Sequence, residues 1–297
     1  MKTFFVLLAC LTFQYSFTQL PVPASGKIIR HANFKSVYVD ARNIDVWLPD
    51  NYSSQKKYAV LYMHDGQMLF DSTVTWNKQE WMADETVAAL INQHKIQDCI
   101  VVGIWNNDQK RHAEYFPQKA LNYLTDDDKK ELLVLLKNQP LGDNYLQFLV
   151  KEVKPFIDSV YSTYKDRKHT FVAGSSMGGL ISMYAICEYP KVFYGAGCLS
   201  THWTGIFRAD NNPVPAALLT YFGAHVPSHK KHKIYFDYGN KTLDSLYQPF
   251  QLQADEIMKA KGYSAKNWET EFFAGANHSE NAWQKRLSIP LEFLMKK

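Results

Sequence analysis

Ser176 is the central residue of a Gly-x-Ser-x-Gly motif, formed by residues 174–178 of this 297-residue chain. An apolar, strand-like run at residues 169–173 precedes the motif, and residues 180–187 after it have helical spacing. A serine at a tight turn between a strand and a helix can act as a nucleophile toward an acyl carbonyl, because the turn lifts its hydroxyl into a cleft. The alternative is a Gly/Ser-rich turn that only caps the following helix.

A nucleophilic serine needs a base that takes its proton. His278 is the first candidate, since it lies in a turn just after the last predicted strand, at the sheet edge where Ser176 is expected. A surface histidine with no catalytic role is the alternative. His202 also follows a predicted strand at this edge, and we keep it as a substrate contact or second candidate base.

The base needs a carboxylate that orients it. In hydrolases with this type of turn, the chain order is serine, acid, histidine. Asp237 and Asp244 both lie between Ser176 and His278, at or just after a predicted strand at residues 233–237. We favour Asp244, because its loop can reach across to His278, whereas the direction of the Asp237 side chain depends on strand register. Either carboxylate could instead cap a helix.

Ester hydrolysis also requires hydrogen-bond donors for the oxyanion. The N–H of Met177, at the start of a predicted helix, is one candidate. The N–H of Gln67 is the other, in a loop after a predicted strand where Gly66 permits a turn. His64, Asp65 and Asp71 of the same loop could ligate a metal, but no second ligand pair matches them, so we expect no metal site.

Several tryptophans flank these loops and could form the walls of a substrate site. We select Trp76 and Trp203 as candidates, because an indole at a strand end can stack on a sugar or an aromatic ring. Core packing is the alternative for both side chains.

The chain reads as strands alternating with helices, which indicates an α/β fold. A hairpin around residues 41–43 is expected to open it, and the predicted strands cover residues 36–39, 44–48, 58–63, 99–105, 169–173, 193–199, 233–237 and 268–273. Predicted helices include one that Asp84 can cap, residues 145–161 with a kink at Pro155, residues 249–259 and one from residue 280 onward. Continuous apolar strands predict a mostly parallel sheet with helices on both faces and an antiparallel N-terminal hairpin.

We expect a single domain over residues 20–297, with an insertion around residues 106–144 that forms a lid or a substrate wall. Residues 1–19 predict a cleaved signal peptide, because a lysine precedes an apolar run that ends in small and polar residues. The expected location is therefore secreted or periplasmic, and a lipoprotein anchored through Cys10 is the less favoured alternative. No later run is long enough to span a membrane, so we expect no stable membrane insertion.

The net charge and the cysteine content give no sign of a nucleic-acid-binding protein or of a fold held by several disulfides. The net charge is only +4 and no long basic cluster occurs, so no nucleic-acid partner is expected. Beyond the signal peptide, Cys99, Cys187 and Cys198 lie in apolar surroundings and predict buried core residues. A disulfide between Cys187 and Cys198 is the alternative in an oxidising compartment.

Together these residues resemble the putative-esterase family of α/β-hydrolases, which includes esterase D, enterochelin esterases, feruloyl and acetyl-xylan esterases and mycolyltransferases. The resemblance is carried by residues 64–67, 174–179, 237–239 and 275–278, with Asp244, Trp283 and Arg286. It implies the α/β-hydrolase fold, a triad of Ser176, Asp244 and His278, and an oxyanion hole made by the Gln67 and Met177 amides. One departure from the family pattern is the loop at residues 239–244, which is longer than in some members.

The sequence thus predicts a secreted serine carboxylic ester hydrolase that works through an acyl-enzyme and needs no cofactor. Its substrate could be an acylated sugar or polysaccharide, a siderophore ester, or a simple short-chain ester. An acyltransferase with the same triad is the alternative, and a non-catalytic glycan-binding protein is a third reading. Nothing in the sequence indicates an oligomeric state.

Overall fold

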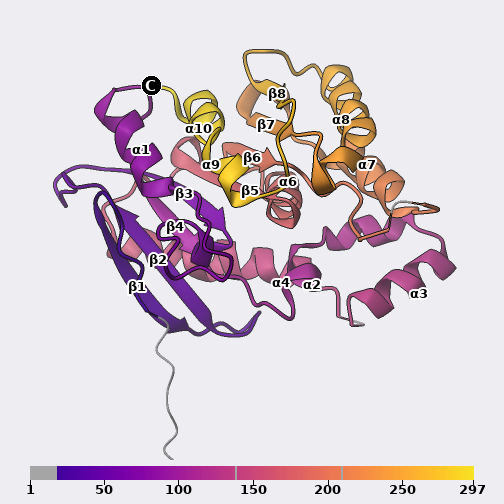
Figure 1. The fold of residues 1–297 in the computed structure, drawn as a ribbon, viewed down its shortest axis with the longest axis horizontal. Helices are drawn as coiled ribbons and strands as arrows, with labels where there is room; N and C mark the ends of the chain where they lie inside the picture. The colour runs from indigo at the N-terminus through magenta and orange to yellow at the C-terminus, as the bar shows by residue number, and fades with distance from the viewer. Residues whose placement is uncertain (1–18, 138, 209) are drawn as a thin grey trace, which may run out of the picture.

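An eight-stranded sheet forms the centre of the computed structural model, which describes residues 19–297 except 138 and 209 (Figure 1). Residues 1–18, which hold most of the predicted signal peptide and Cys10, lie outside the described residues. The strand order is β1-β2-β4-β3-β5-β6-β7-β8. The strands are β1 (Lys27–Phe34), β2 (Arg42–Leu48), β3 (Ala59–His64), β4 (Cys99–Ile104), β5 (Thr170–Ser175), β6 (Gly195–Leu199), β7 (Lys233–Tyr238) and β8 (Trp268–Phe272).

The sheet is mixed but mostly parallel. β2 runs antiparallel to β1 and to β4, and each remaining pair of neighbours is parallel. This confirms the predicted α/β-hydrolase fold class with an antiparallel N-terminal hairpin. Because β3, β5, β6, β7 and β8 are parallel, the loops that follow them meet at one edge of the sheet.

Helices cover both faces of the sheet, and each face has its own hydrophobic core. In β3, Val60 and Tyr62 face one core while Leu61 and Met63 face the other, as expected for a strand buried on both sides. The first core also holds side chains of α4 (Gly142–Gln147), α5 (Lys154–Val160), α6 (Met177–Glu188), α7 (Val214–His225) and α8 (Gln248–Ala260). The second holds those of α1 (Ala83–Asn92), α9 (Glu280–Gln284) and α10 (Ser288–Met295).

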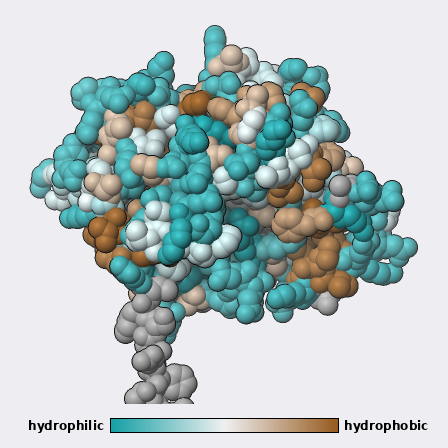
Figure 2. Space-filling view, in the orientation of Figure 1, coloured by the Kyte–Doolittle hydropathy of each residue, from teal (hydrophilic) through white to brown (hydrophobic). Residues whose placement is uncertain are grey.

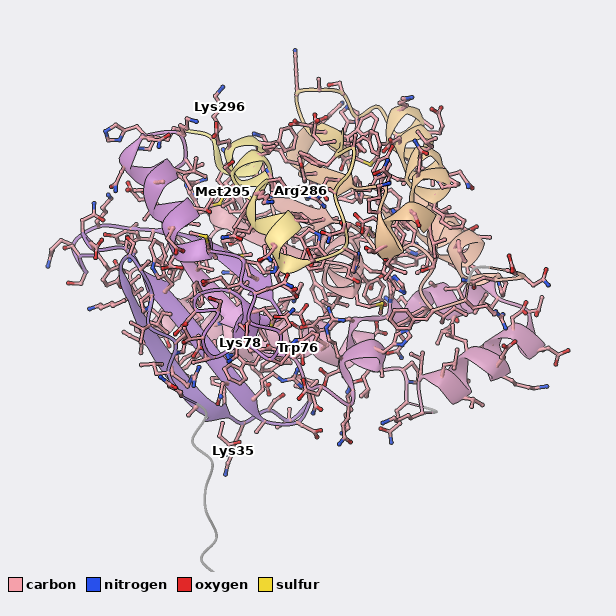
Figure 3. The ribbon with its side chains drawn as sticks, in the orientation of Figure 1. Lys35, Trp76, Lys78, Arg286, Met295 and Lys296 are labelled. Atoms are coloured by element: carbon pink, nitrogen blue, oxygen red, sulfur yellow. The ribbon has the colours of Figure 1, made fainter. Side chains whose placement is uncertain are left out.

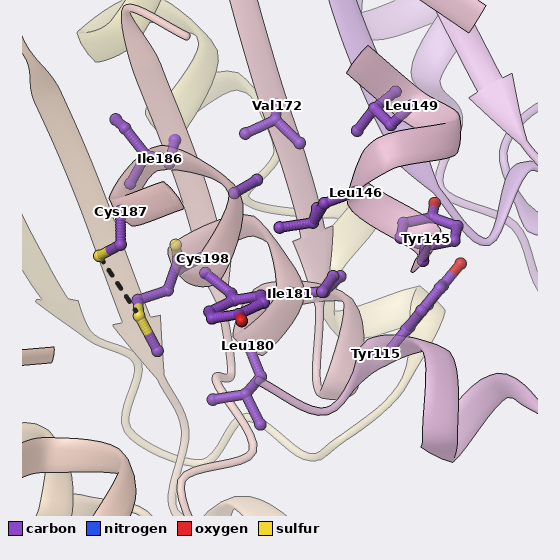
Figure 4. Close-up of a cluster of buried hydrophobic side chains, with 14 of the residues drawn as sticks. Tyr115, Tyr145, Leu146, Leu149, Val172, Leu180, Ile181, Ile186, Cys187 and Cys198 are labelled. Atoms are coloured by element: carbon purple, nitrogen blue, oxygen red, sulfur yellow. Dashed lines mark hydrogen bonds between the residues drawn. The ribbon is translucent and has the colours of Figure 1, made fainter. Parts of the chain in front are cut away.

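The three described cysteines are buried and free. Figure 4 shows Cys187 of α6 and Cys198 of β6 within the first core, where the Cys187 thiol contacts the sulfur of Met183 at 3.9 Å. Burial raises the pKa of each thiol, which makes it an inert apolar side chain. The expectation of core cysteines is confirmed, and the alternative Cys187–Cys198 disulfide is not formed.

The N-terminal hairpin differs from the prediction in its first strand. β1 is Lys27–Phe34, with Lys27 paired to Leu48, whereas the predicted strand at residues 36–39 is a turn. The Ser36 hydroxyl accepts hydrogen bonds from the N–H groups of Tyr38 and Val39, which curls the backbone there.

The predicted helix at residues 145–161 is three consecutive pieces. A π-helical turn, Phe148–Val153, lies between α4 and α5, immediately before Pro155 near the start of α5. Proline lacks the N–H that an unbroken α-helix would use, so the backbone widens in the preceding turn. The predicted kink therefore takes the form of a π-turn. The predicted C-terminal helix is likewise divided, into α9 and α10.

Asp84 does not cap α1. Met82 is the N-cap residue and Asp84 lies in the first turn, where its carboxylate accepts hydrogen bonds from the N–H groups of Ala24 and Ser25. The Asp84 side chain thus binds the N-terminal segment to α1 and does not cap the helix.

Residues 106–144, the predicted insertion, contain α2 (Arg111–Tyr115), a 3₁₀ segment (Gln118–Tyr123) and α3 (Asp126–Leu135). Figure 1 shows α3 at the periphery of the molecule, far from β1. In the view of Figure 2, hydrophilic residues cover most of the surface and apolar residues form small patches. Within the described part of the chain, no helix is both long and apolar enough to cross a membrane.

Candidate active site

Ser176 occupies a strained turn between β5 and α6. Its backbone has φ 58° and ψ −123°, a conformation that non-glycine residues rarely adopt. Neighbouring strands hold this turn, since the Ser176 N–H donates to the Leu199 carbonyl at 2.9 Å and the Ser176 carbonyl accepts from His202 N–H at 3.1 Å. A Cβ on Gly174 would lie 2.9 Å from the Gly178 backbone, so the close approach of strand and helix requires glycine there.

The Ser176 side chain lines a cavity of about 570 Å³, together with Gln67, Arg111, His278 and Trp283. The Ser176 hydroxyl lies near the Tyr247 phenol, whose pKa is raised by burial and partly lowered by this hydroxyl. Among the described residues, no side-chain hydrogen bond joins Ser176 to His278. The serine and the histidine therefore line the same cavity without a direct hydrogen bond between them. Such bonds between catalytic groups commonly tighten only when substrate is bound.

His278 is held by Asp244 across two loops. Nδ1 of His278 lies 2.6 Å from Oδ1 of Asp244, and the His278 N–H donates to the Thr242 hydroxyl at 2.9 Å. Gly239 lets the loops touch, because a Cβ there would lie 2.3 Å from the Ala276 carbonyl oxygen. The contact leaves Nε2 of His278 as the ring nitrogen that can exchange a proton with a substrate or with Ser176.

Asp244 is fixed through its second oxygen. Oδ2 accepts from the Ser200 hydroxyl at 2.7 Å and from the Gly239 N–H at 2.6 Å. Trp283 and Arg286 each donate to the Ser200 oxygen, so Ser200 links both to the carboxylate. Burial on its own raises the pKa of Asp244, but hydrogen bonds and charge from His278, with help from Ser200, lower it overall, which keeps the carboxylate ionised.

Asp237, the alternative acid, belongs to a different contact. Its carboxylate forms two hydrogen bonds with Arg286, at 2.8 and 3.1 Å, and accepts from the Ser200 N–H. Burial raises its pKa to about 6, against the opposing charge of Arg286. Of the two candidates, Asp244 is the one that contacts His278.

Of the two candidate oxyanion donors, Gln67 lines the Ser176 cavity and Met177 directly follows Ser176 in the chain. Met177 is the first residue of α6, and the first N–H groups of a helix have no acceptor within the helix. Gln67 lies in a short 3₁₀ turn after Asp65, whose φ of 57° redirects the chain. Gly66 is required in this turn, because a Cβ would lie 2.4 Å from the carbonyl carbon of Gly103.

The three side chains considered as metal ligands form hydrogen bonds with other residues of the chain. Nδ1 of His64 is 2.7 Å from the Tyr145 hydroxyl, and burial lowers the His64 pKa to about 4. Asp65 forms two hydrogen bonds of 2.7 Å with Arg111, and this guanidinium outweighs burial and lowers the pKa of Asp65. Asp71 accepts from the Val22 N–H. Across the described residues, no three His, Cys, Asp or Glu side chains are grouped to hold a metal ion.

The three candidate substrate contacts have different surroundings. Trp76 is 82% exposed and lines the Ser176 cavity. Figure 3 shows it below the short helix α9 that follows the His278 loop. Trp203, in contrast, is fully buried, donates to Gln251 at 2.8 Å and packs in the core, so it does not form a wall of this cavity.

His202 is fully buried, and Nδ1 lies 2.7 Å from the Tyr247 hydroxyl. Burial lowers its pKa to about 3, so the ring is neutral. Its backbone N–H donates to the Ser176 carbonyl, and its ring contacts Tyr247, which lies near Ser176.

Sequence reasoning missed Ser200 and Tyr247. Ser200 follows β6 directly, so the rule that ligands gather at strand carboxyl ends could have identified it. Tyr247 lies beyond the Asp244 loop at the start of α8, and no sequence signal relates it to Ser176.

The family model described as Putative esterase matches residues 38–293, which is most of the chain. The chain belongs to the putative-esterase family. Membership confirms the resemblance drawn from the sequence and makes this esterase a carboxylic ester hydrolase. A curated relative is the uncharacterized protein YbbA of Bacillus subtilis, 24% identical over 260 residues, which cover 85% of this chain and 92% of YbbA.

Solved structures show the same fold at low identity. One is a mutant of the feruloyl esterase module from Clostridium thermocellum in complex with sinapinate, with 19% identity, a TM-score of 0.62, and coverage of 92% of this chain and 89% of that chain. Another is the enterobactin esterase of Shigella flexneri, with 16% identity and a TM-score of 0.64. The match covers 92% of this chain and 60% of that chain.

Proposed function

We propose that this esterase is a serine hydrolase in which Ser176, His278 and Asp244 form a catalytic triad. The observation that carries the proposal is the 2.6 Å contact between His278 and Asp244 at the cavity that Ser176 also lines. The strained turn at Ser176 supports it, because this backbone conformation is costly and is typical of a nucleophile turn.

In the proposed reaction, Oγ of Ser176 attacks the acyl carbonyl carbon while Nε2 of His278 takes the hydroxyl proton. Substrate binding brings the Ser176 hydroxyl and Nε2 of His278 within hydrogen-bond distance of each other. The carbonyl electrons move to oxygen, where the N–H groups of Gln67 and Met177 stabilise the charge. Each such donor contributes about 3–4 kcal/mol to the transition state.

The tetrahedral adduct then expels the alcohol, which takes the proton from His278 and leaves an acyl group on Ser176. Water attacks this acyl-enzyme, again with His278 as base, and releases the acid. Asp244 keeps the imidazole in one orientation and stabilises its charged form, and Ser200 keeps Asp244 in place.

An assay with 4-nitrophenyl acetate tests the nucleophile. Ser176→Ala is expected to lower kcat by about 10⁴-fold or more, because no hydroxyl remains to form the acyl-enzyme. Ser182→Ala is the matched control, since its hydroxyl donates to the Gly178 carbonyl within the same helix. Activity near the wild-type level in Ser176→Ala would reject the triad.

We also propose that the esterase acts outside the cytoplasm, on an acylated sugar, a polysaccharide or a siderophore ester. Support for the location is the N-terminal composition, with an apolar run at residues 4–13 after Lys2. N-terminal sequencing of the exported protein should find a start near residues 19–21. Recovery of the intact N-terminus in the cytoplasm would reject this location.

A further inference from the structure

A second cavity adjoins the one that contains Ser176. It has a volume of about 380 Å³ and shares four lining residues with the first cavity: Gln67, Trp76, Asn106 and Asp108. Beyond these, its lining includes Arg30 of β1, Asp45 of β2, Phe70, and Trp105, which directly follows β4. The two cavities therefore meet at the Gln67 side of the reaction centre.

A third cavity adjoins the Ser176 cavity at the His278 loop. It shares Gln79 and Ser279 with the Ser176 cavity and is otherwise lined largely by residues 272–277 and 281–286. His278 lines the central cavity but not the one at Trp105. In the proposed reaction His278 protonates the departing alcohol, so the alcohol lies toward the His278 loop and the acyl group toward Gln67.

Two tryptophans contribute to the walls of the second cavity, and one of them, Trp105, is held in place by polar contacts. The Trp105 indole donates to the Asp45 carboxylate at 2.8 Å, and the Arg30 guanidinium lies 4.7 Å from the centre of the Trp105 ring. Arg30 and Asp45 form two further hydrogen bonds, at 2.7 and 2.8 Å. Trp76 stands at the junction of the two cavities with 82% of its surface exposed, so its ring is available to a ligand.

Charge in the two cavities disfavours an anionic acyl group. Apart from His278, the cationic side chains among their described lining residues are Arg30 and Arg111, each in a two-point ion pair with Asp45 or Asp65. Asp108 and Glu280 add further negative charge to the lining. An acid that carries a carboxylate, or a ferric tris-catecholate, would meet net repulsion here.

We propose that this second cavity is an acyl-binding subsite for an uncharged, ring-bearing acyl group, which stacks on Trp76 and rests against Trp105. The inference rests on the proposed function, because the acyl side is defined by His278 as the group that protonates the alcohol. It narrows the substrate to esters whose acid is bulky and neutral, in preference to acetate and to anionic acids.

Four 4-nitrophenyl esters test the subsite: acetate, benzoate, 4-hydroxybenzoate and 4-carboxybenzoate. A common leaving group keeps the alcohol side constant. Trp76→Ala is expected to lower kcat/KM for benzoate and 4-hydroxybenzoate by about tenfold more than for acetate, through loss of ring stacking. Trp76 is exposed, so its removal leaves the core intact. An equal loss for all esters would overturn the subsite and leave the triad standing.

Reversal of the charge at Asp108 provides a second test of the subsite. Asp108→Lys should raise kcat/KM for 4-carboxybenzoate relative to benzoate by at least threefold, because it turns repulsion into attraction at the junction of the cavities. Asp127→Lys makes the same charge change on exposed α3 and should leave this ratio at the wild-type value. A ratio that both variants shift equally would contradict the subsite. Wild-type protein that hydrolyses none of the four esters would overturn the proposed function itself.

Discussion

His278 and Asp244 lie 34 positions apart in the sequence, and their side chains meet with 2.6 Å between Nδ1 and Oδ1. The contact depends on two loops that Gly239 allows to touch and on Ser200, which holds the far oxygen of Asp244. Asp237, although equally buried, is paired with Arg286 instead. At this sheet edge, Asp244 therefore hydrogen-bonds to the imidazole of His278, and Asp237 hydrogen-bonds to the guanidinium of Arg286.

This separation predicts opposite outcomes for two matched substitutions. Asp244→Asn should lower kcat by about 10³–10⁴-fold with little loss of stability, because an amide cannot hold the imidazole in the required tautomer. Asp237→Asn should instead lower the free energy of unfolding by about 3 kcal/mol, since it removes the carboxylate that pairs directly with buried Arg286 and leaves Asp244, 4.0 Å away, as the nearest negative charge. Steady-state kinetics and urea denaturation of both variants provide the comparison. If Asp237→Asn lost more activity than Asp244→Asn, the acid would be misassigned.

The two histidines near Ser176 should also differ. His278→Gln is expected to lower kcat by about 10⁴-fold or more, because the proton acceptor is lost. His202 is buried and neutral, and among the described contacts it meets Ser176 through its backbone N–H and not through its ring, so His202→Gln should retain activity within about tenfold of wild type. Circular dichroism of each variant confirms folding. A His278→Gln enzyme that kept most of its activity would make His202 the base.

Glycine at the nucleophile turn has a measurable structural role. Gly174→Ala should lower the free energy of unfolding by about 1–3 kcal/mol, because the new Cβ would lie 2.9 Å from the Gly178 backbone. Gly223→Ala, within α7, is the control. Its Cβ would make ordinary contacts with Ile257 at 3.7 Å or more, so it should add about 0.5–1 kcal/mol through helix propensity. Denaturant unfolding should show changes of opposite sign, and a neutral Gly174→Ala would contradict the packing.

Asp84 should make stability depend on pH. Burial, with the neighbouring Glu85, raises its pKa to about 7, so the folded protein keeps a proton that the unfolded chain has released. Between about pH 4 and 7 this group therefore makes the free energy of unfolding fall as pH rises, by up to about 1.4 kcal/mol per pH unit.

Urea denaturation at pH 5, 6, 7 and 8 measures this slope. Asp84→Asn should flatten it, whereas Asp71→Asn should not, because the pKa of Asp71 is lowered and its titration lies below the window. Asp71 is a fair control, since its carboxylate also binds the N-terminal segment. An unchanged slope in Asp84→Asn would show that Asp84 is ionised in the folded protein.

Apolar runs made the inner strands predictable, since β3, β4 and β5 are buried on both faces and lack polar residues until their ends. β1 was missed because it is an edge strand in which half of the residues are polar and only one is buried. Helix α7 was not predicted, because it is apolar on nearly every side and shows no helical period.

Placement of side chains at the sheet edge was only partly predictable. Ser176, His278 and Gln67 line one cavity. Their motifs follow parallel strands, so their meeting at one edge of the sheet was predictable from the sequence. The burial of Trp203 and the partners of Asp237 and Asp244 depend on contacts between distant loops, which local sequence does not encode. The catalytic roles of these residues, the location and the single-domain organisation stay predictions.

Labelling by a fluorophosphonate probe tests the central claim most directly, because the probe forms a covalent bond only with an activated serine. Peptide mass spectrometry of the labelled protein should find the adduct on Ser176, with no adduct in Ser176→Ala and at least a hundredfold slower labelling in His278→Gln. An adduct on another residue, or labelling of Ser176→Ala at the wild-type rate, would contradict the account.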